Sequence, residues 1–340
     1  MNKIPGSICQ FSKKQLQHLC CGCGLCVAVC PTNCLELRES SDGHYQPVCM
    51  NKSQCVSCSK CTIVCPGIQQ EKNYSLDFSK EIVYGHSQDQ ELRWKSASGG
   101  VTTELLRFML QKKIVDYIVT SSRYSAGNKP QPIIVNTSEQ LKFVSGSNYC
   151  PVPMGLAIRR IMEQEGNYAI VCLPCVAQGI RKLMQIDSVI AKRISFIITL
   201  LCNHTPSFHA TNFLTKKYLG TCDISDIAEI RYRGEGWFGQ MKIKLRNGLS
   251  AQVPFSEYFA SSFSSCFHRP RCQMCLDHFG AGADVAMGDA DFVKYRCKSE
   301  NSGETICFVH NEKLLEILRG MADRNQIFLH NDVDEGEVIN

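Results

Sequence analysis

The sequence predicts a protein of the α+β / α/β class, in which a small cysteine-rich domain precedes a larger mixed α/β domain. Two observations predict this organisation. Two cysteine runs of identical spacing lie before residue 70, and after residue 80 β-branched apolar runs alternate with patterns of helical period. A length of 340 residues with 44% hydrophobic and 20% charged residues suits a chain of two or three domains with a sizeable core.

The cysteine runs both read C-x2-C-x2-C-x3-C-P, the spacing with which bacterial-type ferredoxins hold cubane iron–sulfur clusters. In such proteins the fourth cysteine of each run binds the other cluster. This rule predicts two sets of ligands. The first cysteine set is Cys20, Cys23, Cys26 and Cys65, and the second cysteine set is Cys55, Cys58, Cys61 and Cys30. Structural zinc is the alternative, but a zinc ion needs only four ligands and does not explain this complete, repeated spacing.

Neighbouring residues support the cluster interpretation. Gly22 and Gly24 stand between ligands, where the backbone must turn tightly, and Pro31 and Pro66 follow the last thiolate of each run. The cysteines outside the pattern are interpreted as small buried side chains, and in this region they are Cys9, Cys21, Cys34 and Cys49. Residues 1–69 therefore form a predicted ferredoxin-like domain with two [4Fe-4S] clusters, and the polar residues 70–80 form a linker.

The remainder, residues 81–340, is expected to form an α/β domain with a mostly buried sheet. Strands are predicted at 114–120, 168–173 and 194–201, and helices at 101–110, 154–162, 177–184 and 208–219. Shorter strands follow at 230–232, 241–245 and 250–254, with Asn247-Gly248 as a hairpin turn. Strands at 284–287 and 305–309 and a helix at 312–321 complete the pattern.

Composition limits the classes of partner and compartment. The formal charge of +5 is mildly basic, but no Lys/Arg run with interleaved aromatic residues occurs, so nucleic acid is not an expected partner. No apolar stretch approaches the ~18 residues of a transmembrane helix, and no targeting segment is evident. The chain is long and has 22 cysteines, many of them at the spacing of cluster ligands. This use of cysteine favours a reducing, cytoplasmic compartment over a secreted protein.

Two further features of the larger domain are candidates for chemistry. Small residues, Ser96 to Gly100, precede the helix predicted at 101–110, which is typical of a phosphate site and equally of an ordinary helix cap. Cysteines stand at two predicted strand ends and in one C-x2-C loop. They suggest either a third tetrathiolate cluster or structural side chains, and we call them the third cysteine set: Cys175, Cys202, Cys272 and Cys275.

Taken in order along nearly the whole chain, these motifs resemble the coenzyme F-420 hydrogenase/dehydrogenase beta-subunit family, in the version with an N-terminal two-cluster ferredoxin domain. The resemblance runs through residues 96–100, 146–149, 173–175, 202–207, 233–239 (RGEGWFG), 272–275 and 288–289. It implies a flavin-binding domain over 81–340, with an N-terminal part of about 81–155 and a C-terminal part of about 156–340.

The resemblance also implies site residues. Those that would hold FAD are Ser96, Ser98, Gly99, Gly100, Gly146 and Ser147, and the third cysteine set would ligate a third [4Fe-4S] cluster near the flavin. Tyr149 and His204 are candidate proton donors, although His204 at a strand end also suits a structural role. Asn148 departs from the lysine common in relatives, which puts a deazaflavin substrate in doubt.

Two functions follow from this resemblance. The preferred one is an iron–sulfur flavoprotein oxidoreductase that passes electrons between [4Fe-4S] clusters and FAD and exchanges a hydride with an organic substrate or a deazaflavin. The alternative is an electron-transfer subunit that relays electrons between a partner hydrogenase or dehydrogenase and ferredoxin, with no organic substrate of its own. Either function expects an electron-transfer protein as partner, and the sequence leaves oligomerisation open.

Overall fold

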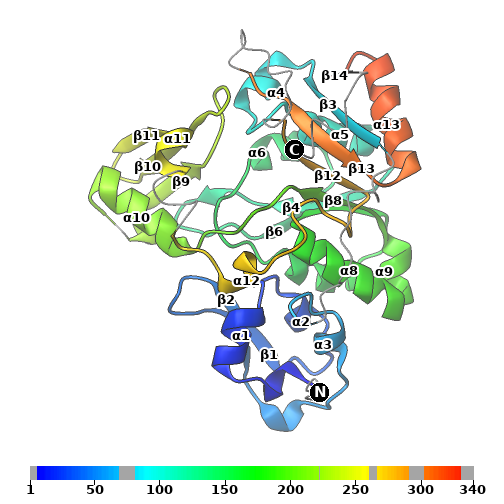
Figure 1. Cartoon of the computed structure of the whole chain (residues 1–340), viewed down its shortest axis with the longest axis vertical. Helices are drawn as coiled ribbons and strands as arrows, with labels where there is room; N and C mark the ends of the chain where they lie inside the picture. The colour runs from blue at the N-terminus through cyan, green and yellow to red at the C-terminus, as the bar shows by residue number, and fades with distance from the viewer. Residues whose placement is uncertain (1–5, 69–80, 222, 260–265, 291–301, 331–340) are drawn as a thin grey trace.

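The computed structural model describes residues 6–68, 81–221, 223–259, 266–290 and 302–330, and the linker predicted at 70–80 lies outside them. Figure 1 shows a mixed α/β body above a small N-terminal region, which confirms the predicted fold class. In the described part of the chain, no helix combines the length and apolar character needed to cross a membrane.

Short elements separated by cysteine loops build the N-terminal region. One antiparallel hairpin pairs β1 (Leu35–Glu39) with β2 (Tyr45–Cys49). Helices surround it, namely η1 (Ile8–Gln10), α1 (Lys13–Leu19), α2 (Leu25–Ala28), η2 (Lys52–Gln54) and α3 (Lys60–Ile63). Each run has a short helix that contains its third cysteine: Cys26 lies in α2 and Cys61 in α3, so both runs have the same local conformation there.

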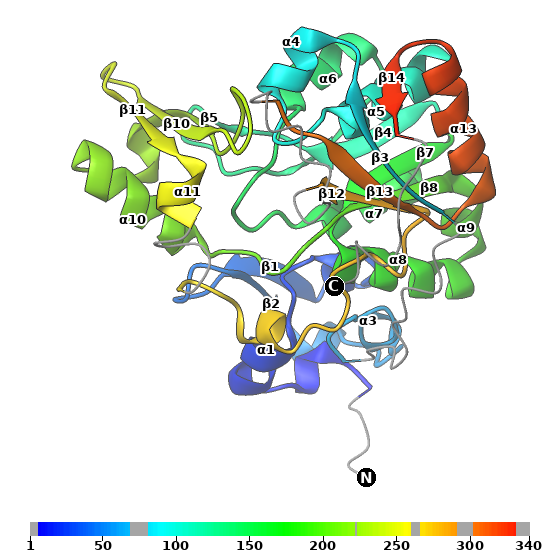
Figure 2. The same cartoon turned by 45° about the horizontal axis from the view of Figure 1, so that its top comes forward.

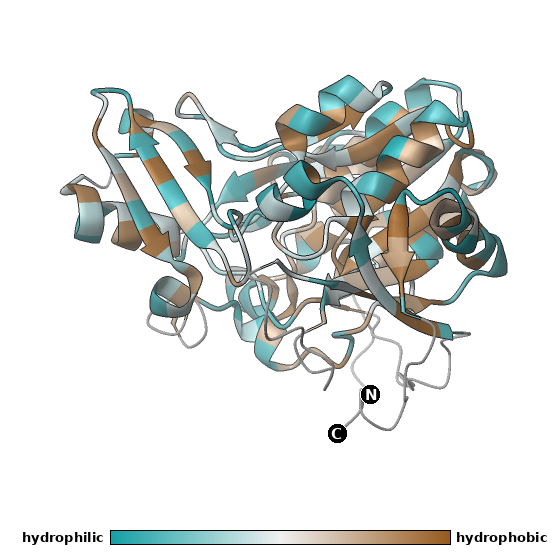
Figure 3. Ribbon diagram, turned by 90° about the horizontal axis from the view of Figure 1, so that it is seen from above, coloured by the Kyte–Doolittle hydropathy of each residue, from teal (hydrophilic) through white to brown (hydrophobic). Residues whose placement is uncertain are grey.

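The body is organised around an eight-stranded sheet in the order β14-β3-β13-β12-β8-β7-β4-β6. Its centre is parallel, from β12 (Val285–Asp289) through β8 (Ile194–Leu200) and β7 (Tyr168–Cys172) to β4 (Tyr117–Ser121). Antiparallel strands complete the edges: β14 (Ile327–Leu329), β3 (Glu81–Ser87), β13 (Thr305–Val309) and β6 (Pro132–Val135). Because both faces are covered, the central strands are almost continuously apolar (Figure 3).

Helices cover the two faces of this sheet. One face packs on α5 (Val101–Gln111), α6 (Ser138–Val144) and α13 (Glu312–Asp323). The other packs on α7 (Ala157–Glu163), α8 (Pro174–Ile186) and α9 (Ser188–Arg193), with η4 (Met154–Leu156) before them. Helix α4 (Gln90–Lys95) follows β3 and leads to the glycine loop before α5.

A second sheet stands beside the first and is fully antiparallel, in the order β11-β10-β9-β5. Its strands are β5 (Tyr124–Ser125), β9 (Ile227–Arg231), β10 (Gln240–Leu245) and β11 (Ser250–Pro254), and apolar and polar residues alternate along them (Figure 3). Helices α10 (Phe208–Leu219), η5 (Ile224–Asp226) and α11 (Phe255–Tyr258) accompany it. The hairpin predicted at Asn247-Gly248 is confirmed, since β10 pairs with β11 across it.

The N-terminal region packs onto the body through α7 and α8, and Figure 2 shows it below α8. Leu25 is fully buried there, against glycines that leave it room. A Cβ at Gly155 would lie 2.7 Å from the Leu25 nitrogen, and one at Gly179 would lie even closer to Leu25 Cδ1. Main-chain contact continues the interface, because the Gly155 N–H donates to the Cys23 carbonyl at 2.8 Å.

Several sequence expectations need correction. The predicted strand at 114–120 begins at Tyr117, and the helix predicted at 177–184 begins already at Pro174, because proline suits the first helical turn. The interpretation of Cys9 and Cys49 as plain buried side chains is wrong: they form a disulfide with a Cα–Cα distance of 5.2 Å. Sequence spacing gave no signal for it, because the two residues meet only where η1 packs on β2.

Candidate functional site

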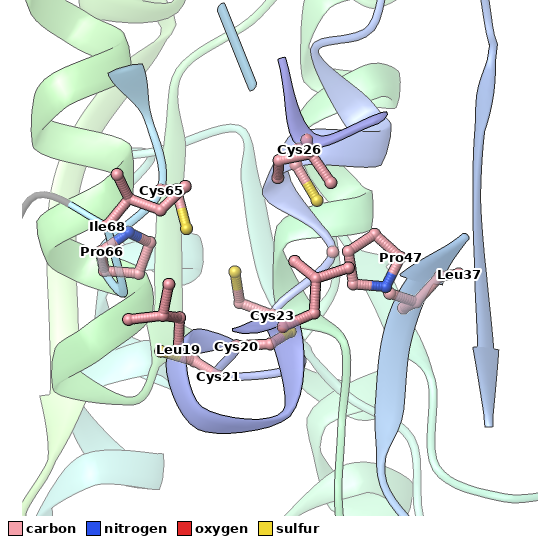
Figure 4. Close-up of a pocket in the computed structure, with 13 residues that line it drawn as sticks. Leu19, Cys20, Cys21, Cys23, Cys26, Leu37, Pro47, Cys65, Pro66 and Ile68 are labelled. Carbon is pink, nitrogen blue, oxygen red and sulfur yellow. The ribbon is translucent and has the colours of Figure 1, made fainter. Parts of the chain in front are cut away.

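The first cysteine set lines one cavity in the N-terminal region. In Figure 4 the sulfur atoms of Cys23, Cys26 and Cys65 point into the same space, with Cys20 at its lower side. Cys65 comes from the second run, as the crossed pairing predicts. The remaining walls are largely apolar and include Leu16, Leu37 and Ile68, and such walls exclude water from a buried cluster.

The second cysteine set lines a separate cavity nearer the surface, where Cys58 is exposed. Cys30 of the first run joins Cys55, Cys58 and Cys61 there. Two of these sulfur atoms have hydrogen-bond partners: the Ile8 N–H donates to Cys61 Sγ at 3.4 Å, and Ser7 Oγ lies 3.1 Å from Cys55 Sγ. Four thiols and two donors are a fitting environment for a thiolate-ligated cluster, whose potential such hydrogen bonds adjust.

The ligand loops of the two cavities have similar backbone geometry. Gly22 and Gly24 adopt left-handed conformations with φ of 70° and 82°. Ser57 and Ser59 occupy the same positions of the second run and adopt φ of 51° and 61°. Serine is unfavourable at positive φ, so the ligand spacing imposes this conformation on both runs whatever residue is present.

The third cysteine set is brought together from three segments. Cys175 lies in the first turn of α8, Cys202 follows β8, and Cys272 and Cys275 lie in and just after α12 (Pro270–Gln273). Burial raises the pKa of the Cys202 thiol, and nearby Cys272 and Cys275 raise it further. Because four such thiols cannot ionise together without a compensating cation, the donor set fits a metal cluster that removes their protons.

Cys21 is a fifth thiol at this place, and its interpretation as an ordinary buried side chain missed its surroundings. Its interaction with Cys175 is the main cause that lowers the pKa of Cys21, to about 7, and burial opposes this shift. Arg271 and Arg269 lower this pKa as well. Cys21 also lines the first cavity beside Cys20, so it lies between the first and third cysteine sets.

Two arginines fix this junction, and sequence analysis singled out neither. Arg269 is buried, donates to the Cys20 carbonyl at 2.8 Å and to the Tyr45 carbonyl at 2.5 Å, and so holds the first ligand loop. Arg271 donates to the Pro66 carbonyl at 3.4 Å. Both lie next to the C-x2-C pair of the third set, which was the available sequence signal.

A buried polar network lies on the other side of the third set. Arg233 forms a bidentate ion pair with Asp289, at 2.6 and 3.2 Å, and its Nη1 donates to Tyr149 Oη at 3.3 Å. Trp237 Nε1 donates to Asp289 Oδ1 at 3.3 Å. Burial opposes the charge of Arg233, but Tyr149 and Asp289 outweigh it and raise its pKa above the ordinary value.

Tyr149 connects this network to the third cysteine set. Burial is the main cause that raises the pKa of Tyr149, and Cys202 is among the groups whose charge raises it further. The phenol therefore stays protonated at neutral pH. His204 lies on the same side, stacked on His268 with ring centroids 3.7 Å apart and near Phe259 at 6.1 Å.

The glycine loop 96–100 adjoins the network through Trp237. A Cβ at Gly303 would lie 2.6 Å from Trp237 Cδ1 and 3.2 Å from the Ser98 carbonyl carbon, so the loop and the indole share one neighbour. Ser96 Oγ donates to the Leu92 carbonyl at 2.7 Å, and Ser98 Oγ donates to the Glu304 carbonyl. Both hydroxyls are therefore used within the fold.

Main-chain groups of this loop remain suited to an anion. Gly100 is the N-cap of α5 in a left-handed conformation, and no side chain caps that helix. Gly99 lies so close to β3 and β13 that a Cβ would meet the Gly85 carbonyl oxygen at 2.6 Å. An uncapped N-terminus of an 11-residue helix presents N–H groups to a phosphate.

Gly146 and Ser147, which are predicted to lie along the cofactor, belong to a loop after α6. Gly146 has φ of 120° and nothing within 4 Å of an added Cβ, so space is open beside it. Ser147 lies half-buried between Gly146 and Asn148. Asn148 donates to Ser121 Oγ and to the Ser122 carbonyl, each at 2.9 Å, so its side chain ties the loop to the end of β4.

Family models match almost the whole described chain. Residues 82–159 match the N-terminal domain and residues 165–335 the C-terminal domain of the coenzyme F420 hydrogenase/dehydrogenase beta subunit. Residues 19–67 match a 4Fe-4S dicluster domain.

Individual relatives agree with these matches. The F420H2 dehydrogenase of Methanosarcina mazei contains a subunit that is 25% identical over 80% of this chain and 76% of its own length. The coenzyme F420 hydrogenase beta subunit of Methanothermobacter thermautotrophicus is 25% identical over 62% of this chain and 72% of its own. A chain of the F420-reducing [NiFe] hydrogenase complex from Methanosarcina barkeri has the same fold, with a TM-score of 0.57 and 17% identity over 74% of this chain and 82% of that one.

Proposed function

This chain belongs to the coenzyme F420 hydrogenase/dehydrogenase beta-subunit family, and from that premise we propose that it is an iron–sulfur flavoprotein oxidoreductase. In this proposal, electrons pass between [4Fe-4S] clusters and FAD, and a hydride is exchanged with an organic substrate or a deazaflavin. The observation that carries it is a series of contacting side chains: Tyr149 contacts Arg233, whose partner Asp289 contacts Trp237 beside the Ser98 loop. The charge of Cys202 in the third set raises the pKa of Tyr149 at the other end of this series.

The arrangement of the cysteine sets supports a path for electrons from the second set through the first set to the third. Cys58 of the second set is exposed, and Val56, which lines the same cavity, is 62% exposed, so a protein that donates electrons could contact an apolar side chain there. The charge of Cys61 in the second set is among the causes that raise the pKa of Cys26 in the first set. Cys21 lines the first cavity, and its charge raises the pKa values of Cys272 and Cys275 in the third set. We place the reaction in the cytoplasm, where reducing conditions keep the cluster ligands as thiols, and the Cys9–Cys49 disulfide is the one pair of described cysteines that departs from this state.

For the flavin, the chain offers main-chain rather than hydroxyl groups. The N-terminus of α5 after Gly100 would hold the pyrophosphate, with Ser96 and Ser98 shaping the loop instead of donating. Gly146 and Ser147 would border the ring system, where Gly146 leaves open space. Bound there, FAD would accept electrons singly and donate them in pairs.

Tyr149 is the better placed of the two candidate proton donors. Its hydroxyl accepts a hydrogen bond from Arg233, and burial keeps it protonated. A neutral phenol held by a cation can donate its own proton and be stabilised as it loses it. His204 stacks on His268 and Phe259 and would serve to exclude water from the same side.

The relay function is the second candidate, and the names of the relatives favour it. The two relatives named above are each called a subunit, and the solved structure is a hydrogenase complex. Under this alternative the chain would carry electrons between a partner hydrogenase or dehydrogenase and ferredoxin. The clusters would be the same, but the isolated chain would turn over no organic substrate.

The deciding experiment is anaerobic purification followed by measurement of iron, acid-labile sulfide and flavin per chain. About one FAD and roughly twelve irons are expected, since each cubane holds four irons. The loaded protein, reduced by ferredoxin, is then offered oxidised deazaflavin and a panel of hydride acceptors. Roughly eight irons without flavin would reject the enzyme in favour of the relay, and full loading without turnover of any acceptor would also favour the relay.

A further inference from the structure

Two arginines come opposite each other at the β5 edge of the second sheet. The antiparallel register pairs Tyr124 of β5 with Ile230 of β9, so one position further along Arg123 comes opposite Arg231. Tyr124 and Ile230 are buried in the core, which places the arginine pair, Arg123 and Arg231, on the other face of the sheet. Like charges directly opposite one another destabilise a sheet, so packing alone does not explain this pair.

Neighbouring carboxylates do not neutralise the arginine pair. Glu229 lies 4.0 Å from Arg123 Nη1 and its side chain is 53% exposed, so it offers only a weak ion pair. Glu235 forms its own ion pair with Lys242. Within the described residues, neither arginine of the pair donates a hydrogen bond to a carboxylate. Burial lowers the pKa of both guanidiniums, and the charge of Arg231 lowers the pKa of Arg123 further. The half-buried pair therefore keeps a surplus of positive charge.

Main-chain carbonyls hold both guanidiniums in place. Arg123 Nε donates to the Ser145 carbonyl at 2.8 Å, and its Nη2 donates to Ser145 Oγ at 3.3 Å. Arg231 Nε donates to the Arg233 carbonyl at 3.2 Å, and its Nη2 donates to the Lys95 carbonyl. Because these contacts already fix the two side chains, little further freedom is lost when they bind an anion.

The anchoring carbonyls of Ser145 and Lys95 adjoin the two loops assigned to the flavin. Ser145 directly precedes Gly146, beside which space is open, and Lys95 directly precedes the glycine loop 96–100. Arg123 itself follows the carboxyl end of β4, which pairs in parallel with β7, and ligands of open α/β sheets bind at such ends. The arginine pair thus borders the proposed flavin site.

We propose that Arg123 and Arg231 bind a phosphate or carboxylate group of the organic acceptor, so that the substrate is an anionic compound. Guanidinium groups match the geometry of both anions and form charge-assisted hydrogen bonds with them. An anion between the two arginines would also remove their mutual repulsion. This inference rests on the proposed function, because it requires an acceptor that approaches the flavin. The pyrophosphate of FAD is the other source of the same chemistry, and the test distinguishes the two.

Inorganic pyrophosphate is the probe, and isothermal titration calorimetry measures its binding to the anaerobic, FAD-loaded full-length protein. The loaded protein is used because the pyrophosphate of its flavin already occupies the flavin's own site. Arg123→Gln and Arg231→Gln are each expected to weaken binding about tenfold, the value of one charge-assisted hydrogen bond. Lys244→Gln is the matched control, since it removes an exposed charge opposite Glu229 in the same sheet and should leave binding unchanged.

Lysine variants separate the charge from a structural role of the two arginines. Arg123→Lys and Arg231→Lys keep the positive charge but lose the planar fork that donates to the carbonyls, and they are expected to restore most of the affinity. The iron and flavin contents of every variant check that the protein is still assembled. If the lysine variants lose pyrophosphate binding as fully as the glutamine variants, the arginines hold the loops and do not bind an anion.

Three further outcomes overturn the inference, and they separate it from the proposed function. Pyrophosphate that binds only to the FAD-free protein would assign the arginine pair to the flavin. No binding, or binding that both glutamine variants retain, would reject the anion site and leave the proposed function intact. A chain that takes up no FAD would refute the proposed function and, with it, the assignment to an acceptor.

Discussion

Arg233 is the residue at which burial and charge conflict most clearly. Its side chain is only 3% exposed, whereas Asp289, its ion-pair partner, is 26% exposed. The guanidinium also lies 4.4 Å from the Phe255 ring centroid, and its Nε donates to the Phe238 carbonyl at 3.0 Å. A buried charge with this many partners gives a fixed geometry, and removing one partner leaves it uncompensated.

Replacing the carboxylate should therefore destabilise the fold. Asp289→Asn is expected to lower the free energy of unfolding by about 3 kcal/mol, because it leaves the buried Arg233 charge without its counterion. Anaerobic denaturant unfolding measures this change. The control is Glu36→Gln, which breaks the exposed Glu36–Arg38 pair and should cost less than about 1 kcal/mol. Equal effects in the two variants would show that the Arg233 charge is well solvated.

At the scale of elements, helix α8 joins the two parts of the molecule. Its first turn carries Cys175, and its buried face includes Val176, Ala177 and Ile180. Gly179 lies on the side that meets the N-terminal region, where a Cβ would be 2.8 Å from the Val64 carbonyl and closer still to Leu25. A glycine inside a helix costs stability, so the close approach explains its presence.

Alanine at this position should be harmful although it favours a helix. Gly179→Ala is expected to lower the free energy of unfolding by about 1–3 kcal/mol through overpacking against Leu25. Gly320→Ala in α13 is the matched control, because its Cβ meets only the end of the flexible Arg324 side chain. That variant should gain about 0.5–1 kcal/mol. The packing argument fails if both variants are stabilised when their thermal unfolding midpoints are compared.

At the scale of the whole molecule, the crossed cysteine sets tie the N-terminal region together. Each cavity takes three thiols from one run and one from the other, so neither run completes a site alone. The cavities lie at different depths, with Cys58 exposed and Cys23 buried.

Double variants distinguish crossed from sequential ligation. Cys30→Ser/Cys55→Ser alters one cavity only and should remove roughly four irons, whereas Cys26→Ser/Cys30→Ser alters both and should remove roughly eight. Sequential ligation of each run reverses the two results. Iron and sulfide analysis after anaerobic purification gives the answer, and circular dichroism checks that both variants remain folded.

Features set by residues close together in the sequence were predicted, whereas features that join residues far apart in the sequence were not. The two runs were predicted because their ligand spacing is local, and Ser57 and Ser59 adopt the conformation of Gly22 and Gly24 as the spacing requires. The central strands followed from continuous apolar runs. The disulfide between Cys9 and Cys49 was missed, and so was the eight-strand order, since neither has a local signature.

The sequence by itself therefore determined the cysteine chemistry, the α/β character of the body and the family to which the chain belongs. Local spacing and hydrophobic period are sufficient for these, because they involve neighbours along the chain. Only the tertiary structure decided that Arg269 holds the Cys20 loop and that Arg233 pairs with Asp289. Those contacts join residues 56 and 249 positions apart, and only tertiary packing, within the body for the first and between the body and the N-terminal region for the second, brings such residues together.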